Sequence, residues 1–346
     1  VTNATVVVSG GPEDYTITVT PTGAGDVSLS VPAGAAQDAS GNASTASGTF
    51  VIGSTIVADT QLKISSFTVG RQNRLASSQP GLVRFLRKDI SNSFNANSRL
   101  NFASINGSVS SGNAWAKLTG TKSSNGSYVL GSLGAHTFVS DNFLIGGMLQ
   151  LDYAEDDTNK ISGKGWLVGP YFAAKHSTQP LFFEGRLLYG QTDNEITPLG
   201  TFTDSFKTAR WLAQFRATGE LSYNAGTLMP LLDFTYADDT QKTYTDSLGN
   251  IISGKTVKLM QLTAGMDFRV PVSVRTGSLD LTGGVSAIYS STSDGNADYE
   301  GLRGRADLGI QYSLGEAGTL GVNTFVDGLG SDYQGYGMDI GYNLKF

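Results

Sequence analysis

Long stretches in the C-terminal two-thirds of the chain alternate between apolar and polar residues. Apolar residues take every second position from Met260 to Val270, and the same alternation runs through 335–346. Such alternation predicts β-strands with one apolar and one polar face. The run from Lys258 to Val270 has 13 residues, whereas soluble strands cluster at about 5–6 residues and membrane-spanning strands need about 9–11. The pattern therefore favours strands that cross a membrane.

The connections between the expected strands alternate in length. Tight turns are expected at 141–142, 178–179, 224–226, 273–277 and 315–318. Longer loops, rich in Asp, Thr and Ser, are expected at 155–163, 192–205, 238–256 and 292–300. Short turns on one rim and long loops on the other are typical of an outer-membrane β-barrel.

The pattern predicts an all-β fold, a twelve-stranded antiparallel transmembrane barrel over 113–346. The expected strands are 113–122, 127–139, 143–155, 163–176, 181–192, 205–223, 227–239, 254–271, 278–292, 300–314, 319–328 and 335–346. Because twelve is even, both ends of the barrel should emerge on the short-turn rim. We expect that rim and Phe346 to face the periplasm, and loops 192–205 and 238–256 to face outward.

Charged residues repeatedly share the polar strand face with Gly, Ser and Thr, and in a barrel this face lines the lumen. The charged residues expected to point inward are Glu184, Arg186, Arg210, Arg216, Glu220, Asp233, Asp267, Arg269, Arg303, Arg305 and Asp307. Their signs are mixed, so they can pair across the lumen or with a segment inside it, or simply solvate the pore wall.

A helix is expected before the barrel, at about 60–78. Ile64, Phe67, Arg71 and Leu75 lie on one helical face, while the rest of this stretch is polar or small. Pro80 should end the helix. About nineteen residues at ~1.5 Å each span ~28 Å, close to the ~25 Å apolar band of a barrel. The narrow apolar stripe therefore suits a helix that runs inside a polar lumen.

The rest of the region 54–112 is expected to be a linker. It holds a second short helix near 82–86 and an Asn- and Ser-rich stretch at 91–112. Either helix 60–78 or segment 80–88 can fill the pore. Arg71 should meet an inward carboxylate, such as Glu220, Asp267 or Asp307, or a water molecule, because a buried Arg without a partner is costly.

Residues 1–53 form a different segment, rich in Thr, Val, Gly and Ala, in which Tyr15 to Thr20 alternate as a half-buried strand. Its turn at 32–34 and its loop from Asp38 to Asn42 resemble the closing strands of bacterial immunoglobulin-like repeats. The resemblance implies part of a β-sandwich, with its first strands missing. Asp38, Ser40 and Asn42 are candidate calcium ligands. A turn in which Asp38 bonds its own backbone is favoured, because calcium takes about six to eight oxygens and acidic residues are scarce here.

Composition removes several classes of function. The chain has no Cys and only 2 His, which excludes a disulfide framework and a thiolate site and leaves little for a His-based centre. The net charge of −6 gives no basic patch for nucleic acid. No G-x-S-x-G elbow or phosphate loop occurs. We therefore expect no enzymatic activity and no cofactor.

Residues 113–346 resemble the translocator barrel of autotransporters, the type V secretion proteins of Gram-negative bacteria. The resemblance lies in 133–136 (LGAH), 144–148 (LIGGM), 166–171 (WLVGPY), 236–239 (YADD) and the terminal 342–346 (YNLKF). It implies a location in the outer membrane and a passenger on the cell surface. It also implies that the barrel-assembly machinery reads Tyr342, Leu344 and Phe346. Some of these barrels cleave themselves at paired asparagines, and no such pair exists here, so we expect the passenger to stay attached.

The expected function is export and anchoring of an upstream passenger, whose last repeat is 1–53, by a monomeric barrel in outer-membrane lipid. Three alternatives stay open. A porin would have an open lumen and no helix at 60–78. A surface adhesin would bind a partner through loops 192–205 and 238–256. A soluble adhesin would consist of β-sandwiches only.

Overall fold

The computed structural model describes residues 4–11, 14–22, 26–51, 53–87, 92–99, 102–198, 200, 202–293, 299–315, 318–331 and 335–345. The N-terminal segment holds four strands, which pair as two hairpins: β1 (Ala4–Gly10) with β2 (Tyr15–Pro21), and β3 (Ser28–Leu29) with β4 (Phe50–Val51). Helix α1 (Gly53–Ser77) and the short 3-10 helix η1 (Val83–Phe85) follow.

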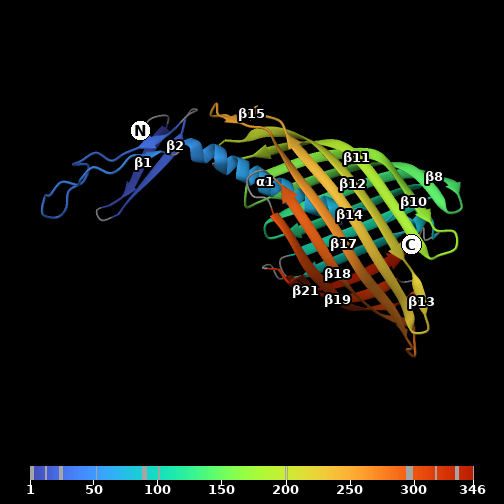
Figure 1. Cartoon of the computed structure of the whole chain (residues 1–346). Coiled ribbons are helices and arrows are strands. Elements are labelled where there is room, and N and C mark those ends of the chain that lie inside the picture. Colours follow the sequence, from blue (N-terminus) through green and yellow to red (C-terminus); the bar gives the residue numbers. More distant parts are fainter. Residues whose placement is uncertain are drawn as a thin grey trace.

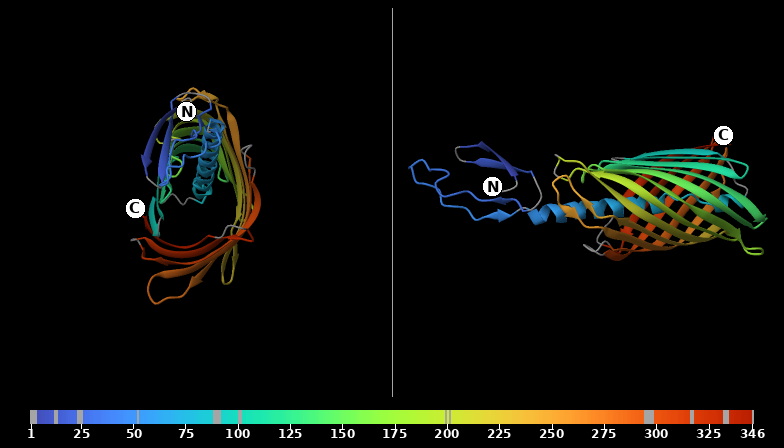
Figure 2. Two further views of the ribbon diagram at one scale, coloured as in Figure 1. Left: turned by 90° about the vertical axis from the view of Figure 1, so that its left-hand side faces the viewer. Right: turned by 90° about the horizontal axis from the view of Figure 1, so that it is seen from above.

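The rest of the chain forms one antiparallel sheet of 15 strands. These strands are β5 (Ser93–Arg99), β6 (Phe102–Ser111), β7 (Ala114–Ser123), β8 (Gly126–Ser140), β9 (Phe143–Asp156), β10 (Ile161–Lys175), β11 (Leu181–Ile196), β12 (Asp204–Gly219), β13 (Leu221–Tyr223), β14 (Gly226–Gln241), β17 (Lys255–Val272), β18 (Ser278–Ser293), β19 (Tyr299–Ser313), β20 (Thr319–Leu329) and β21 (Gly335–Lys345). The short β13 continues the line of β12 and pairs only with β14. Because β21 pairs with β5 and β12 pairs with β14, the ladder of strands returns on itself around a lumen (Figure 2).

The expected antiparallel β-barrel with a helix is confirmed, and all twelve expected strands are present, but the count of twelve is too low. Strands β5 and β6 also belong to the sheet, between β21 and β7. The stretch 91–112 was expected to be a linker because it has few large apolar residues. Its apolar residues do alternate, however, and Phe94, Ile105 and Val109 are exposed on the sheet. An unpaired strand edge cannot be left in lipid, and these two weakly apolar strands supply the pairing that closes the sheet.

The two rims differ as the spacing predicts. The connections at 141–142, 224–225 and 273–277 lie on the rim where β21 ends and β5 begins, the short-turn rim. The opposite, long-loop rim carries the connection between β14 and β17, which holds the hairpin of β15 (Tyr244–Thr245) and β16 (Ile251–Ile252).

Helix α1 starts seven residues earlier than expected and runs from the long-loop rim into the lumen, with the N-terminal strands outside the barrel (Figure 1). It ends at Ser77, three residues before Pro80, as the restriction that proline places on the preceding residue predicts. None of the described helices combines the length and hydropathy needed to cross a membrane.

The sheet is apolar outside and mixed inside. Along β8 and β9, exposed outward residues such as Leu133 and Leu151 alternate with buried lumenal residues such as Tyr128 and Leu130. The hydrophobic core lies inside the barrel, where α1 and η1 pack against the wall. The principal contacts of α1 are with β8, β10, β14, β16 and β17.

Candidate functional site: the lumen and its helix

The apolar stripe of α1 is the surface that meets the barrel wall. Ile64, Phe67 and Leu75 are buried in the same core cluster as the lumenal Leu130 and Leu212. These residues recur at helical spacing, so one narrow face of the helix packs against the wall. The opposite face is mostly polar or small, and among the described residues its one exposed large apolar residue, Leu62, is 51% exposed.

Arg71, on the same stripe, is held by a carboxylate that the sequence analysis did not single out. Its Nε lies 2.7 Å from Asp152 Oδ2 and its Nη1 donates to Asn194 Oδ1 at 2.8 Å. The other oxygen of Asp152 accepts from Arg210 Nη1 at 2.8 Å. The side chains of Arg71, Asp152 and Arg210 are each at most 2% exposed. The expected partners Glu220, Asp267 and Asp307 were therefore wrong.

A second carboxylate, Asp239, completes this buried group, which we call the central network. Its Oδ1 lies 3.3 Å from Arg210 Nε and accepts from Thr208 Oγ1 at 2.8 Å. Its Oδ2 accepts from Gln72 Nε2 on the helix at 3.1 Å, and Gln72 Nε2 also donates to Val257 O at 3.0 Å. Two arginines thus meet two aspartates, so the charges inside the central network balance.

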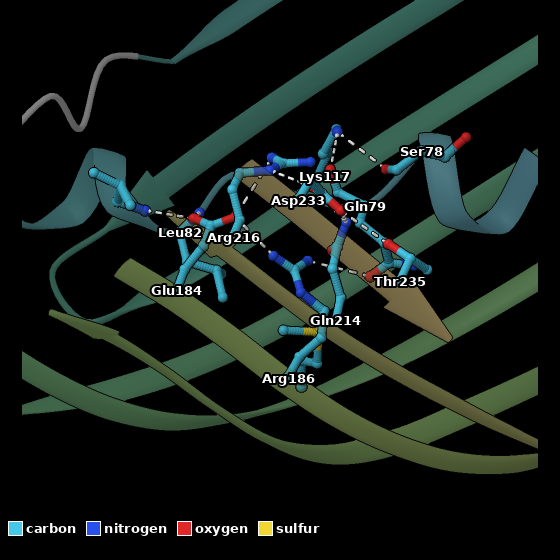
Figure 3. A network of polar contacts seen from close by, with 12 residues as sticks. Ser78, Gln79, Leu82, Lys117, Glu184, Arg186, Gln214, Arg216, Asp233 and Thr235 are labelled. Carbon is cyan, nitrogen blue, oxygen red and sulfur yellow. Dashed lines mark hydrogen bonds and ion pairs between the residues drawn. The ribbon is translucent and has the colours of Figure 1, made fainter. Parts of the chain in front are cut away.

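The chain after the helix is held by a second group, the lower network, drawn in Figure 3. Glu184 Oε2 accepts from the backbone nitrogens of Leu82 at 2.6 Å and Val83 at 3.0 Å, while its Oε1 lies 3.0 Å from Arg186 Nη2. Arg216 lies between Asp233, at 2.6 Å, and Glu184, at 3.5 Å. A carboxylate of the wall therefore binds the backbone of the segment directly.

Amide groups link the same segment to the wall. The Gln79 and Gln150 side chains donate to one another, at 3.2 and 3.0 Å. Arg186 Nη1 donates to Gln79 Oε1 at 3.2 Å, and Lys117 Nζ donates to Ser78 O at 3.1 Å. The lower network thus holds the segment at Ser78, Gln79, Leu82 and Val83.

The short helix η1 packs against an aromatic cluster of the barrel wall. The Phe85 ring lies 4.5 Å from the His136 ring and 6.0 Å from Trp115, measured between centroids. Trp115 Nε1 donates to Tyr171 Oη at 2.8 Å, which fixes both rings. Helix 60–78 and segment 80–88 were alternatives for filling the pore, and the described part of both packs inside it.

The lumenal charges lie in two environments. Glu184, Arg186, Arg210 and Asp233 are buried. On β17 and β19, Asp267 and Arg269 are exposed, and Arg303, Arg305 and Asp307 are half-buried. Arg303 and Arg305 share Asp327, at 3.2 and 3.8 Å. Glu220 is half-exposed and pairs with Arg87 of the segment at 2.7 Å.

Several of the residues that hold the helix were missed by the sequence analysis: Gln72, Gln79, Lys117, Gln150, Asp152 and Asp239. Alternation along β9 places Gln150 and Asp152 on the face opposite Leu151 and would have found them. Strand β21 carries Tyr342 and Leu344 in the sheet, and Phe346 lies outside the described residues.

The N-terminal loop has the geometry of a turn. Asp38 Oδ1 accepts from Ser40 N at 2.9 Å and Asn42 N at 2.8 Å, and Oδ2 accepts from Asn42 Nδ2 at 2.8 Å. These bonds, those from Asn42 above all, lower the pKa of Asp38 below its ordinary value. Within the described residues no three His, Asp or Glu side chains gather as a metal site would need.

A closed antiparallel sheet with an apolar outer face around a charged lumen defines a membrane β-barrel, and in this chain a helix lies inside the lumen. Residues 102–324 match the model of the autotransporter β-domain family, which is more than half of the chain. The chain therefore belongs to this family and is an outer-membrane translocator domain of a Gram-negative bacterium.

Three solved structures are similar to this chain. The β domain of the Bordetella autotransporter BrkA is 16% identical, covers 75% of this chain and 99% of its own, and has a TM-score of 0.45. The translocator domain of NalP from Neisseria meningitidis is 17% identical over 84% and 99%, with a TM-score of 0.46. The transport unit of AIDA-I from Escherichia coli is 12% identical over 83% and 98%, with a TM-score of 0.43. No curated protein matches the chain.

Proposed function

We propose that the barrel keeps its N-terminal passenger attached to the cell through α1, which acts as both tether and plug. The observation that carries this proposal is the path of the chain. It leaves the N-terminal strands, enters at the long-loop rim, crosses the lumen once through the central and lower networks, and starts β5 at the short-turn rim. The passenger segment and the barrel termini therefore lie at opposite ends of the pore.

The proposed orientation follows from this path. The short-turn rim faces the periplasm, and the long-loop rim with residues 1–51 faces the outside. Export ends when α1 reaches its final position in the lumen, where Arg71 pairs with Asp152 and Gln72 donates to Asp239. Withdrawal of the helix would also expose the buried side chains of Ile64, Phe67 and Leu75, each of which contributes about 1.5–3 kcal/mol by its burial, so withdrawal is strongly opposed.

The proposed partners are those of an inserted, uncleaved monomer. The outward apolar residues would contact lipid: Leu133, Leu149, Leu151, Val168, Leu187, Trp211, Phe215, Leu262, Met266, Val285, Leu302, Leu308 and Ile310. Tyr342, Leu344 and Phe346 would be read by the barrel-assembly machinery, so deletion of Phe346 should reduce the amount of folded barrel. The domain itself would carry no catalytic role and no cofactor.

Single-channel recording in planar bilayers tests the plug. Removing 53–88 should raise the conductance well above that of the intact protein, because the deletion empties the lumen of everything that crosses it. Equal conductance of the two proteins would contradict the plug and favour the porin.

One observation favours a second function, passage of small solutes beside the helix. The lumenal charges of β17 and β19 are exposed or half-buried, whereas those facing α1 are buried. Such a path would give the intact protein a small but measurable conductance.

A further inference from the structure

A polar cavity of about 390 Å³ lies beside η1, between the segment inside the pore and the wall. Strands β6, β7, β11 and β12 supply its wall, near the short-turn rim. Four cationic side chains line it: Arg84 and Arg87 from the segment, and Lys117 and Arg216 from the wall. Asn106 and Thr218 add polar groups that can donate hydrogen bonds.

Lys117 makes this cavity unusual. Its ammonium donates to the carbonyls of Ser78 at 3.1 Å and Gln79 at 3.4 Å. In the part of the chain that the structure describes, no carboxylate forms an ion pair with it. Figure 3 shows Arg186 and Arg216 in the same group of residues as Lys117. A half-buried ammonium in this position lacks a counter-charge, and supplying one would be favourable.

The carboxylate that borders the cavity is already engaged. Glu184 accepts two backbone N–H groups at one oxygen and lies within ion-pair distance of Arg186 and Arg216 at the other. Glu220 pairs with Arg87. Asp233 pairs with Arg216 at 2.6 Å. None of these three carboxylates forms an ion pair with Lys117 among the described residues, so they leave the charge of Lys117 uncompensated.

We propose that this cavity binds a small tetrahedral oxyanion, with phosphate chemistry, between Lys117 and the arginines that line it. Phosphate oxygens accept charge-assisted bonds from lysine and bidentate bonds from arginine, which suits a site lined by both. Because Arg84 and Arg87 belong to the segment and Lys117 and Arg216 to the wall, the anion joins the plug to the barrel. The phosphate group comes either from the free ion or from a lipid headgroup at the rim.

Calorimetric titration of the intact, detergent-refolded protein with inorganic phosphate tests the site. Wild type should show saturable binding that sulfate competes away. Lys117→Gln should weaken binding by about tenfold or more, a loss of about 1.4 kcal/mol, because it removes a charge-assisted hydrogen bond to the anion. The matched control is Lys122→Gln on the same strand, where Lys122 is exposed and pairs with Asp157 outside the cavity; its affinity should equal that of wild type.

Heat-modifiable migration on gels shows whether each variant folds, and Lys117→Arg, which keeps the charge, should retain binding if Lys117→Gln does not fold. Repeating the titration in nanodiscs separates the two sources. With a phosphate-free, non-ionic detergent in the first titration, weaker phosphate binding in zwitterionic phosphatidylcholine nanodiscs assigns the site to headgroups, and equal binding assigns it to the free ion. Absence of saturable binding in wild type, or equal affinity of wild type and a folded Lys117→Gln, overturns the proposal.

Discussion

The lumen wall has two halves. In both, the alternation of apolar and polar positions along the strands directs charged residues into the lumen. On the half formed by β8 to β14, the charged side chains next to α1 are sealed, and those of Arg210, Asp152 and Asp239 are 1–4% exposed. On the half formed by β18 to β20, Arg303, Arg305 and Asp327 pair in a similar way, but they are 21–36% exposed. The principal contacts of the helix are with β8, β10, β14, β16 and β17, and Figure 2 shows it away from the strands of the second half.

The difference shows that the contribution of an ion pair to stability depends on its burial as well as on the distance between its charged groups. An exposed pair contributes about 0–1 kcal/mol, because water solvates either partner when the other is lost. Loss of one partner of a buried pair costs about 3–5 kcal/mol, because the remaining charge has no solvent. The sealed half should therefore hold the helix, and the open half should govern what passes beside it.

The largest effect is expected from Asp152→Ala. The variant leaves both Arg71 and Arg210 without their shared carboxylate, and should lose about 3–5 kcal/mol of stability in denaturant unfolding in detergent. The matched change in the open half, Asp327→Ala, should cost at most about 1 kcal/mol. Similar losses for the two variants would show that the halves do not differ in this way.

The next largest loss of stability is expected where the apolar face of α1 packs against the barrel wall. Leu75 is 1% exposed and Leu62 is 51% exposed on the same helix. Leu75→Ala should cost about 2–5 kcal/mol, through lost burial and the cavity left behind. It should also make the pore open more often in single-channel recordings. Leu62→Ala should change neither quantity, and an equal response of the two variants would mean that the helix has no preferred side.

Much of this arrangement could be predicted from the sequence, because alternation along a strand depends only on neighbouring residues. Such reasoning found the twelve strands and the buried stripe of α1. It missed β5 and β6, whose pattern is carried by Asn, Ser and Gly with few apolar residues.

The partners of the helix could not be found in the same way. Asp152, Arg210 and Asp239 come from β9, β12 and β14, and only closure of the barrel and the rotation of α1 bring them to Arg71 and Gln72. Alternation fixes which face a side chain lies on, but it does not fix the depth of a helix that slides and turns inside the pore.

A smaller difference between the two halves is expected in their access to solvent. It can be measured at introduced Cys residues, because the chain has no native Cys that would react. Ser132 on β8 is buried, whereas Ser286 on β18 is half-buried, and both lie on lumenal positions. A charged thiosulfonate should modify Ser286→Cys at least about tenfold faster than Ser132→Cys, a difference of ~1.4 kcal/mol in activation free energy. Equal rates of modification would mean that solvent reaches the two halves equally. Deleting 53–88 should then bring the two rates together, because the helix is what seals Ser132.

The smallest effect is expected in ion selectivity. Asp267 and Asp307 lie on lumenal positions of β17 and β19, in register on either side of Gly284, and no ion pair is formed by either among the described residues. Carboxylates beside a water-filled path favour cations, but salt screens exposed charges beyond about 10 Å at 0.1 M, so each should act only locally. Asp267→Asn together with Asp307→Asn should lower the cation preference of the residual conductance less than about twofold at that salt, and more at 0.01 M, where the screening length is ~30 Å.

The control, Asp157→Asn, lies in the connection between β9 and β10 outside the lumen and should leave the reversal potential unchanged. If the double variant and this control have the same reversal potential at both salt concentrations, the ions do not pass along β17 and β19, and the comparison of the two halves holds for stability alone.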